Sequence, residues 1–230
     1  MRHRTRLNEP CTSTGAVENE TSFSDTRRRM DLLDLKKHLV DICHRASERW
    51  LTSGSGGNIS VRIPNTNRYL CTATGVTFRD TAVENVVEME LGGTQVGGFD
   101  FKPSKEYRWH AGVFATCPDV HGVVHTHSTA TMAFGICGIT PPHMTGQARV
   151  HLKEIQIVPY ADAGSEKLRD LVVDVYERKP DTRIVLLANH GLAASGPSLL
   201  EAYNRAEIVE DSAQAYLHCR LLGREPKLDF

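Results

Sequence analysis

Two histidines separated by a single residue close an apolar stretch of the chain, Val123-Val124-His125-Thr126-His127. If this stretch is a β-strand, side chains alternate between its faces, so His125 and His127 point the same way. Two imidazoles at the end of a buried strand can hold one divalent metal, and a catalytic zinc site needs a third ligand and an open position. The alternative is a pair of core histidines held by ordinary hydrogen bonds.

A second apolar stretch, residues 183–188, also leads into a histidine, His190. Its continuous apolar character predicts a buried strand. If the two strands are neighbours in one sheet, His190 joins His125 and His127 at the same edge. Three histidines around a metal with one free position form a Lewis acid, which binds the oxygens of a carbonyl or enediolate and stabilises their negative charge.

A carboxylate suited to proton transfer lies at the start of a predicted helix. Ser104 is a good N-cap for a helix that runs to Cys117, and Glu106 and His110 share one face of that helix because they are four residues apart. Glu106 is the candidate general acid/base. The alternative for Glu106 is a solvated carboxylate that suits the helix dipole, and we expect His110 to be packed or hydrogen-bonded.

Two glycine-containing loops with hydroxyl side chains flank predicted strands. Residues 52–58 lead into a strand over residues 59–63, and Thr74-Gly75 closes a strand over residues 69–73. Backbone N–H groups and hydroxyls in such loops can bind a phosphate. Spacing alone leaves open the alternative that both loops are ordinary connections.

The composition argues against several classes of function. The chain has 27 Lys and Arg against 28 Asp and Glu, so its charge gives no reason to expect nucleic acid or an anionic membrane as partner. Six cysteines without C-x-x-C spacing favour a reduced, cytoplasmic protein over a disulfide framework. No apolar run approaches the roughly 20 residues that a membrane helix needs.

The order of the predicted elements indicates one domain behind a polar tail. Residues 1–29 lack apolar periodicity and are expected to form a disordered N-terminal tail, with Met30 as an alternative translation start. Residues 30–230 alternate between strands and helices, which predicts an α/β/α arrangement around one mixed sheet. Pro141-Pro142 marks a loop that is expected to carry His143 and His151.

Five ordered motifs resemble the class II aldolase/adducin-head superfamily, and their match covers nearly all of residues 31–222. They are Gly54-Ser55-Gly56-Gly57-Asn58-Ile59-Ser60, Thr72-Ala73-Thr74-Gly75, Pro103-Ser104-Lys105-Glu106-Tyr107-Arg108-Trp109-His110, Val124-His125-Thr126-His127-Ser128 and Leu187-Ala188-Asn189-His190-Gly191. The resemblance implies a single α/β/α domain around a mostly antiparallel, nine-stranded sheet. It also implies a homotetramer with active sites between subunits.

The resemblance further implies a role for each matching residue. His125, His127 and His190 become the ligands of Zn²⁺, with Mn²⁺ or Co²⁺ left open because histidine binds all three ions. Glu106 becomes the acid/base of an aldolase. The positions that match the family's phosphate-binding residues are Ser55, Asn58, Thr74, Gly75 and Ser104.

The residue before Glu106 separates the two activities that the resemblance suggests. The motif around Glu106 resembles fuculose-type aldolases, which implies cleavage of a ketose 1-phosphate to dihydroxyacetone phosphate and an aldehyde through a zinc-stabilised enediolate. Aldolases usually carry a serine where Lys105 stands, and Lys105 resembles the oxo-tetronate phosphate decarboxylases. A lysine there can pair with a substrate phosphate or carboxylate. The third alternative, a non-catalytic adducin-type module, is disfavoured because the whole ligand set is present.

Overall fold

The computed structural model describes residues 20–228, which form six α-helices, a short 3₁₀ turn and eight strands. The helices are α1 (Glu20–Glu48), α2 (Tyr107–Thr116), α3 (Thr129–Ile136), α4 (Gly146–His151), α5 (Glu166–Arg178) and α6 (Leu199–Leu221), and the 3₁₀ turn is η1 (Val83–Asn85). The strands are β1 (Asn58–Arg62), β2 (Arg68–Thr72), β3 (Val86–Glu90), β4 (Gln95–Gly97), β5 (Gly122–Thr126), β6 (Ile155–Val158), β7 (Ile184–Leu187) and β8 (Gly191–Gly196).

All eight strands belong to one sheet with the order β4-β3-β2-β1-β5-β8-β7-β6. Neighbouring strands run antiparallel except for β6 and β7, which are parallel. The strands that lead to the histidines, β5 and β7, are not neighbours, because β8 lies between them. The condition under which His190 was expected to join His125 and His127, that these two strands be neighbours, is therefore not met, and His190 reaches β5 from the loop that enters β8.

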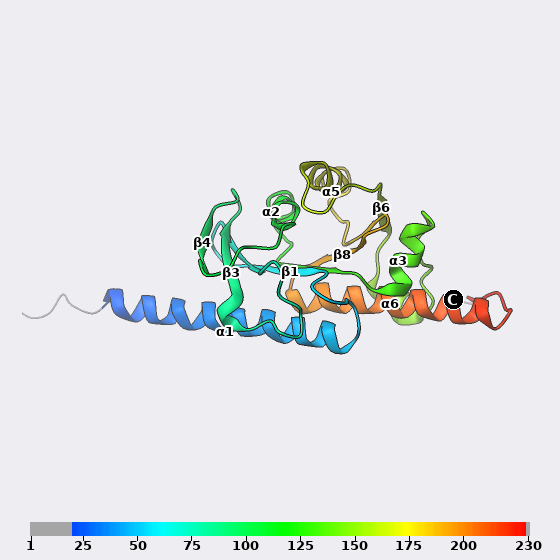
Figure 1. Ribbon diagram of the computed structural model, residues 1–230, viewed down its shortest axis with the longest axis horizontal. Coiled ribbons are helices and arrows are strands. Elements are labelled where there is room, and N and C mark those ends of the chain that lie inside the picture. The colour runs from blue at the N-terminus through cyan, green and yellow to red at the C-terminus, as the bar shows by residue number, and fades with distance from the viewer. Residues whose placement is uncertain (1–19, 229–230) are drawn as a thin grey trace, which may run out of the picture.

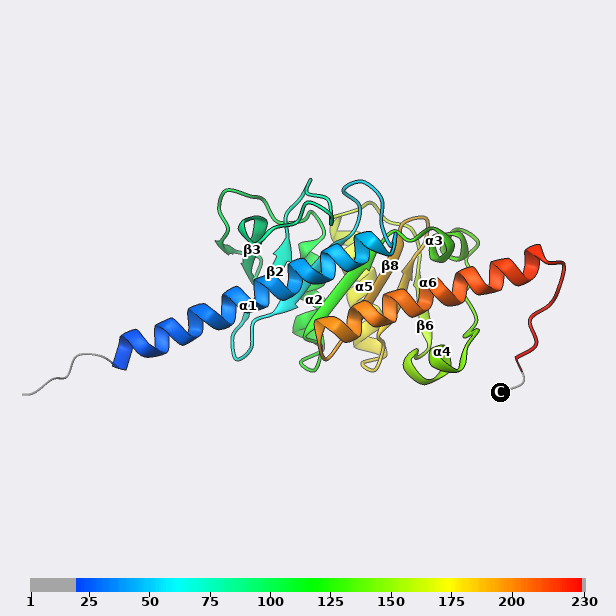
Figure 2. The ribbon, with the colours of Figure 1, turned by 90° about the horizontal axis from the view of Figure 1, so that it is seen from below.

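Helices cover both faces of the sheet, as expected for an α/β/α domain (Figure 1). The long helices α1 and α6 cover one face, and α2 and α5 cover the other. Seen from the side of the long helices, α1 and α6 cross the sheet next to each other (Figure 2). Successive residues of each strand point to opposite faces of the sheet, so they pack in two different helix–sheet layers.

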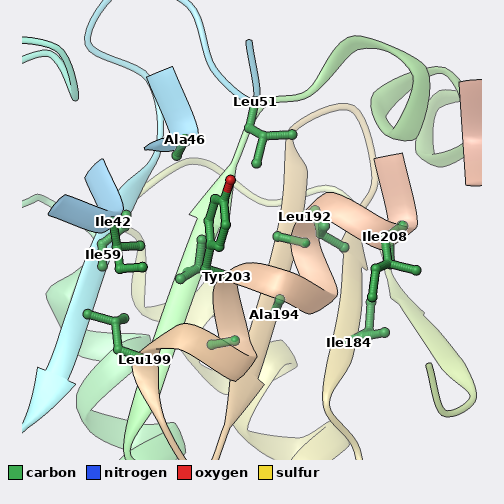
Figure 3. Close-up of a cluster of buried hydrophobic side chains, with 14 of the residues drawn as sticks. Ile42, Ala46, Leu51, Ile59, Ile184, Leu192, Ala194, Leu199, Tyr203 and Ile208 are labelled. Carbon is green, nitrogen blue, oxygen red and sulfur yellow. The ribbon is translucent and has the colours of Figure 1, made fainter. Parts of the chain in front are cut away.

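The layer beneath α1 and α6 contains a large cluster of buried hydrophobic side chains (Figure 3). Ile59 of β1 and Leu192 and Ala194 of β8 point into it, together with Tyr203 and Ile208 from α6. Leu192 and Ala194 are two residues apart because side chains on one face of a strand repeat every second position. Burial of this continuous apolar surface is the main stabilising contribution to the layer.

The layer beneath α2 and α5 combines apolar and polar side chains. Val123 of β5 and Val185 of β7 pack there against α2 residues such as Trp109 and Val113. His125 lies two residues after Val123 and therefore faces the same layer. The histidines thus enter a buried layer that also holds the helix expected to carry Glu106.

Three details differ from the sequence predictions. The sheet has eight strands within residues 20–228, where the resemblance implied nine; Ala73 and Pro103 add one isolated bridge. Helix α1 begins at Glu20 rather than after residue 29, since residues 20–30 contain no Gly or Pro that would stop it. The expected tail over residues 1–19 lies outside the described residues.

The third difference is α4, which contains His151 where a loop was expected. Thr145 caps this helix by accepting a hydrogen bond from the Ala148 N–H. Six residues are too few for apolar periodicity to reveal a helix. Within residues 20–228, no helix combines the length and apolar character required to cross a bilayer.

Candidate metal centre

The end of β5 and the β7–β8 loop bring the three predicted histidines together. His125 is the penultimate residue of β5 and is fully buried, and His127 follows the end of the strand. His190 lies in the loop before β8, where Asn189 adopts a left-handed conformation and the His190 N–H donates to Leu187 O. Because β8 pairs antiparallel with β5, the start of β8 lies beside the end of β5.

The three imidazoles have the spacing of a metal-ligand set. One nitrogen from each ring lies within 4.8 Å of the others. The Nε2 atoms of His125 and His127 are 2.9 Å apart, and the ring centroids are 4.7–5.1 Å apart. Tetrahedral zinc with Zn–N bonds of about 2.0–2.1 Å places its nitrogen ligands roughly 3.3–3.4 Å apart, which falls within the observed range.

The hydrogen bond of His125 determines which of its nitrogens faces the centre. Its Nδ1 lies 2.9 Å from the carbonyl oxygen of Leu192, and a carbonyl can only accept, so Nδ1 carries the proton. When the ring is neutral, Nε2 therefore presents a lone pair to the other histidines. A backbone carbonyl that fixes the tautomer in this way is common behind metal-binding histidines.

Glycine leaves room for the rings on two sides. A Cβ atom at Gly191 would lie 2.3 Å from Thr126 O, 2.8 Å from Cδ2 of His127 and 3.1 Å from Cε1 of His125. A Cβ atom at Gly56 would lie 2.6 Å from Nδ1 of His127. The Gly/Ser loop thus packs directly against the histidines.

Glu106 lies beside the histidines and is 5 % exposed, so the alternative of a solvated carboxylate is wrong. It occupies the N-cap position of α2, so the expectation that Ser104 caps this helix is wrong: the helix begins two residues later than predicted, and Ser104 Oγ accepts from the N–H of Glu106 instead. Its Oε2 is 3.1 Å from Nε2 of His125, and its Oε1 is 3.6 Å from Nε2 of His190. Asn58 donates to Oε2 at 2.9 Å, and the indole N–H of Trp109 donates to Oε1 at 3.3 Å.

The pKa shifts favour the protonation states that a metal site requires. Burial lowers the pKa of His127 to about 3 and that of His190 to about 4, and repulsion from His125 adds to both shifts. Burial would raise the pKa of Glu106, but His125 and His190, which attract its carboxylate when they are protonated, and the hydrogen bond from Asn58 lower it well below its usual range. Neutral imidazoles and an ionised carboxylate are the forms that bind a cation.

The residues present fit a bound cation. The lone pair of His125 Nε2 lies within 3.1 Å of a carboxylate oxygen and 2.9 Å from another imidazole nitrogen. These acceptors repel one another unless a positive charge lies between them. Because these acceptors converge in a partly buried place, the four side chains form a candidate metal centre.

The chain matches the model of the family described as class II aldolase and adducin N-terminal domain over residues 37–217. It belongs to this family. It is 30 % identical to the L-fuculose phosphate aldolase of Methanocaldococcus jannaschii, over 79 % of this chain and 95 % of that protein. It is 31 % identical to the 3-oxo-tetronate 4-phosphate decarboxylase of Haemophilus influenzae, over 79 % of this chain and 86 % of that protein.

Solved structures of the class II aldolase family have the same fold. An L-fuculose 1-phosphate aldolase superposes with a TM-score of 0.76 at 30 % identity, and the match covers 84 % of this chain and 89 % of that chain. The expected α/β/α class II aldolase fold is therefore confirmed.

The residues that the sequence predicts to bind a phosphate lie in three loops and at the first position of β1, around the same end of the sheet. Thr74 donates its N–H to Lys102 O, which joins its loop to the loop that carries Ser104 and Lys105. A Cβ atom at Gly57 would lie 2.6 Å from His125 O and 3.2 Å from the Phe78 ring. The Gly/Ser loop therefore packs against the end of β5 and against the segment that follows Thr74-Gly75.

These candidate residues differ in how accessible they are. Ser55, Thr74, Gly75 and Lys105 are exposed. Asn58 and Ser104 are buried and already serve Glu106, since Asn58 donates to its carboxylate and Ser104 Oγ accepts from its N–H at 3.3 Å. Asn58 Oδ1 is buried and has no hydrogen-bond partner within the described part of the chain.

Two supporting residues were not predicted from the sequence. Trp109 donates to Glu106, and its indole meets the His125 ring edge-on with centroids 5.6 Å apart. Glu210 of α6 accepts from the N–H groups of Ala130 and Thr131 and from the Thr131 hydroxyl, at 2.7–3.1 Å, and so caps the helix that follows His127. No local signal could reveal Glu210, because about 80 residues separate it from its partners.

Proposed function

We propose that this chain is a metal-dependent sugar-phosphate lyase, an aldolase that cleaves a ketose 1-phosphate into dihydroxyacetone phosphate and an aldehyde. The observation that carries the proposal is the convergence of His125, His127, His190 and Glu106 in one partly buried centre. The activity named for the relative from Methanocaldococcus jannaschii supports the same reaction class.

The three histidines would hold a divalent metal, with zinc as the proposed ion and manganese or cobalt as alternatives. When bound, the metal supplies a Lewis acid that stabilises negative charge on substrate oxygens during cleavage of the carbon–carbon bond. Glu106 is the residue we assign to proton transfer, because its carboxylate is ionised, fixed by two hydrogen bonds and adjacent to the histidines.

A phosphate subsite formed by three loops would orient the substrate. Backbone N–H groups and hydroxyls suit a phosphate dianion, and we assign this role to Ser55, Asn58, Thr74, Gly75, Ser104 and Lys105. The exposure of Ser55, Thr74, Gly75 and Lys105 supports a ligand at this place. Holding the phosphate keeps the reacting carbons at a fixed position relative to Glu106.

The second candidate is decarboxylation of a 3-oxo-tetronate 4-phosphate-type acid at the same centre. Lys105 favours it, because an exposed ammonium next to Glu106 in sequence can pair with a substrate carboxylate. The relative from Haemophilus influenzae is named for this reaction. A non-catalytic adducin-type module requires no metal ligands, so the intact histidine set argues against it.

We further propose a cytoplasmic homotetramer with active sites at subunit interfaces. The five cysteines within residues 20–228 are all unpaired, which suits a reducing compartment. Large apolar side chains such as Trp50, Phe99, Ile136 and Leu221 are 63–84 % exposed, and a partner subunit would bury them. Sedimentation equilibrium of the full chain tests the assembly.

The decisive experiment combines metal analysis with a substrate panel. The purified chain is expected to hold one divalent metal per subunit and to release dihydroxyacetone phosphate from a ketose 1-phosphate. His125→Ala should lose the metal and at least about 100-fold in kcat/KM, whereas His121→Ala, an exposed histidine, serves as control. Unchanged lyase activity in His125→Ala would refute the proposal, and release of carbon dioxide from acid phosphates would favour the second candidate.

A further inference from the structure

Strand β1 and helix α2 are joined by a series of polar contacts that begins at Glu106. On β1 the polar residues occupy every second position, Asn58, Ser60 and Arg62. Their partners around α2 occupy every fourth position, at residues 106, 110 and 114. We call these three contacts the polar ladder.

Each contact of the polar ladder is a hydrogen bond in a buried or half-buried place. Asn58 donates to the Glu106 carboxylate at 2.9 Å. The Ser60 hydroxyl and Nδ1 of His110 are 2.5 Å apart, and both residues are at most 2 % exposed. The Arg62 guanidinium donates to the carbonyl oxygen of Phe114 and lies over the ring of the same residue.

The spacing of the polar ladder follows from backbone geometry. Two residues of a strand rise about 6.6–6.8 Å. Four residues of a helix rise about 6 Å and return to the same face. The three contacts can therefore form together in one register of α2 along β1, and a shift of the helix along the strand would break all three.

Apolar packing alone specifies that register less sharply. Trp109 and Val113 bury the rest of this face of α2, but the hydrophobic effect has no preferred direction. Hydrogen bonds weaken steeply with distance and angle, and a buried polar atom that loses its partner is costly. The Ser60–His110 contact matters most here, because it is fully buried and Nε2 of His110 has no partner among the described residues.

The polar ladder connects the helix of Glu106 to the strand next to the histidines. Asn58 lies directly opposite His125 in the β1–β5 pairing. The position of α2 along β1 therefore sets the distance between the Glu106 carboxylate and Nε2 of His125, which is 3.1 Å. We propose that Ser60 and His110 are positioning residues, whose hydrogen bond holds α2 in register with β1 and keeps Glu106 in its place beside the three histidines.

The test compares variants that remove this hydrogen bond with a matched variant elsewhere. Ser60→Ala removes the hydroxyl, His110→Phe keeps a ring without polar atoms, and His110→Asn retains a polar group near the position of Nδ1. Ser195→Ala is the control, because Ser195 is also a fully buried strand serine that bonds a helix side chain, the Tyr176 hydroxyl at 3.0 Å. Its contact joins β8 to α5 and does not involve Glu106.

The activity readout rests on the proposed lyase function. Misplacement of Glu106 should lower kcat by about 10- to 100-fold in Ser60→Ala and His110→Phe, with KM within about twofold and metal content unchanged. His110→Asn should recover part of kcat, and Ser195→Ala should keep it even where its melting temperature falls as far. Retained kcat in folded Ser60→Ala would overturn the inference. So would an equal loss in Ser195→Ala, or a parallel loss of metal.

A second readout does not depend on the reaction. Crystal structures of Ser60→Ala and Ser195→Ala should show the Glu106 carboxylate displaced from His125 in the first variant and unmoved in the second. If the wild-type chain cleaves no sugar phosphate, the proposed function fails, and these structures still decide the role of Ser60 and His110. An unmoved carboxylate in Ser60→Ala would refute that role. If His110→Phe does not fold, Ser60→Ala carries the test alone.

Discussion

Asn58 and His125 lie directly opposite each other in the β1–β5 pairing, and both side chains contact the same atom, Oε2 of Glu106. The amide of Asn58 donates to this oxygen, whereas the lone pair of His125 Nε2 opposes it. Glu106 is thus stabilised from the side of β1 and faces an acceptor on the side of β5. Among the described residues, the carboxylate of Glu106 therefore lacks a donor on the side of the three histidines, where a cation is proposed to bind.

Asn58→Asp tests this relationship with little change of shape. The substitution places a second carboxylate 2.9 Å from Oε2 of Glu106, and two carboxylates at that distance compete for one proton. We expect kcat/KM to fall at least about 100-fold at neutral pH, because the new carboxylate repels that of Glu106 by several kcal/mol and so perturbs the proposed acid/base. Asn85→Asp is the control, since Asn85 is also buried but its side chain bonds Ala82 and Asp80 rather than any residue of the site. Equal losses in both variants would contradict this prediction.

Gly191→Ala should disrupt the histidine set without removing a ligand. A Cβ atom at this position would lie 2.3 Å from Thr126 O and 2.8 Å from the His127 ring, so the β5–β8 pairing or the ring must move. We expect metal affinity to fall about 10- to 100-fold, as for other changes behind metal ligands. Gly146→Ala, where a Cβ atom meets nothing within 4 Å, should bind metal normally. Isothermal titration of the apo proteins with Zn²⁺ measures both, and equal affinities would show that the close approach has no consequence.

Much of the site was predictable because its residues sit in locally recognisable places. His125 and His127 share a face through the two-residue period of a strand, and His110 was expected to be packed or hydrogen-bonded, which its contact with Ser60 confirms. The β1 sequence alternates polar and apolar residues, which indicates one polar face. It does not identify what that face contacts.

The remaining features depend on contacts between distant parts of the chain. Strand β8 lies between β5 and β7, and no local pattern specifies which strands pair. Glu210 caps α3 from a helix about 80 residues away. The N-cap residue Ser128 makes no side-chain capping bond, so the usual local signal at this helix start does not describe its stabilisation.

Glu210→Gln should reveal the cap through the pH dependence of stability. Burial raises the pKa of Glu210, but hydrogen bonds from Gln214, Thr131 and Ala130 outweigh it and lower the pKa below its ordinary value. A lowered pKa in the folded state means that the stabilisation is complete above the unfolded pKa of about 4.3 and is lost as the pH falls through the folded value.

We therefore expect Glu210→Gln to lower the free energy of unfolding by about 2 kcal/mol at pH 7 and by less below pH 4. Urea denaturation across this pH range measures the difference. Glu207→Gln is the control on the same helix, because Glu207 forms a partly exposed ion pair with Arg49 and should cost under about 1 kcal/mol. A destabilisation by Glu210→Gln that stays constant down to pH 3 would contradict the assigned role of its charge.

Lys105→Met addresses which substrate group the exposed ammonium contacts. The main chain of Lys105 is fixed, since a Cβ atom on Gly164 would lie 2.8 Å from its carbonyl oxygen, while its side chain is exposed. If the ammonium pairs with the phosphate, KM should rise about tenfold for ketose phosphates and acid phosphates alike, and the effect should shrink at high salt. If it pairs with a carboxylate, KM should rise for acid phosphates only. Lys153→Met, on an exposed ion pair with Asp181, controls for the change in net charge. An unchanged KM for every substrate would show that Lys105 does not contact the substrate. The argument for decarboxylation would then lose the residue on which it rests.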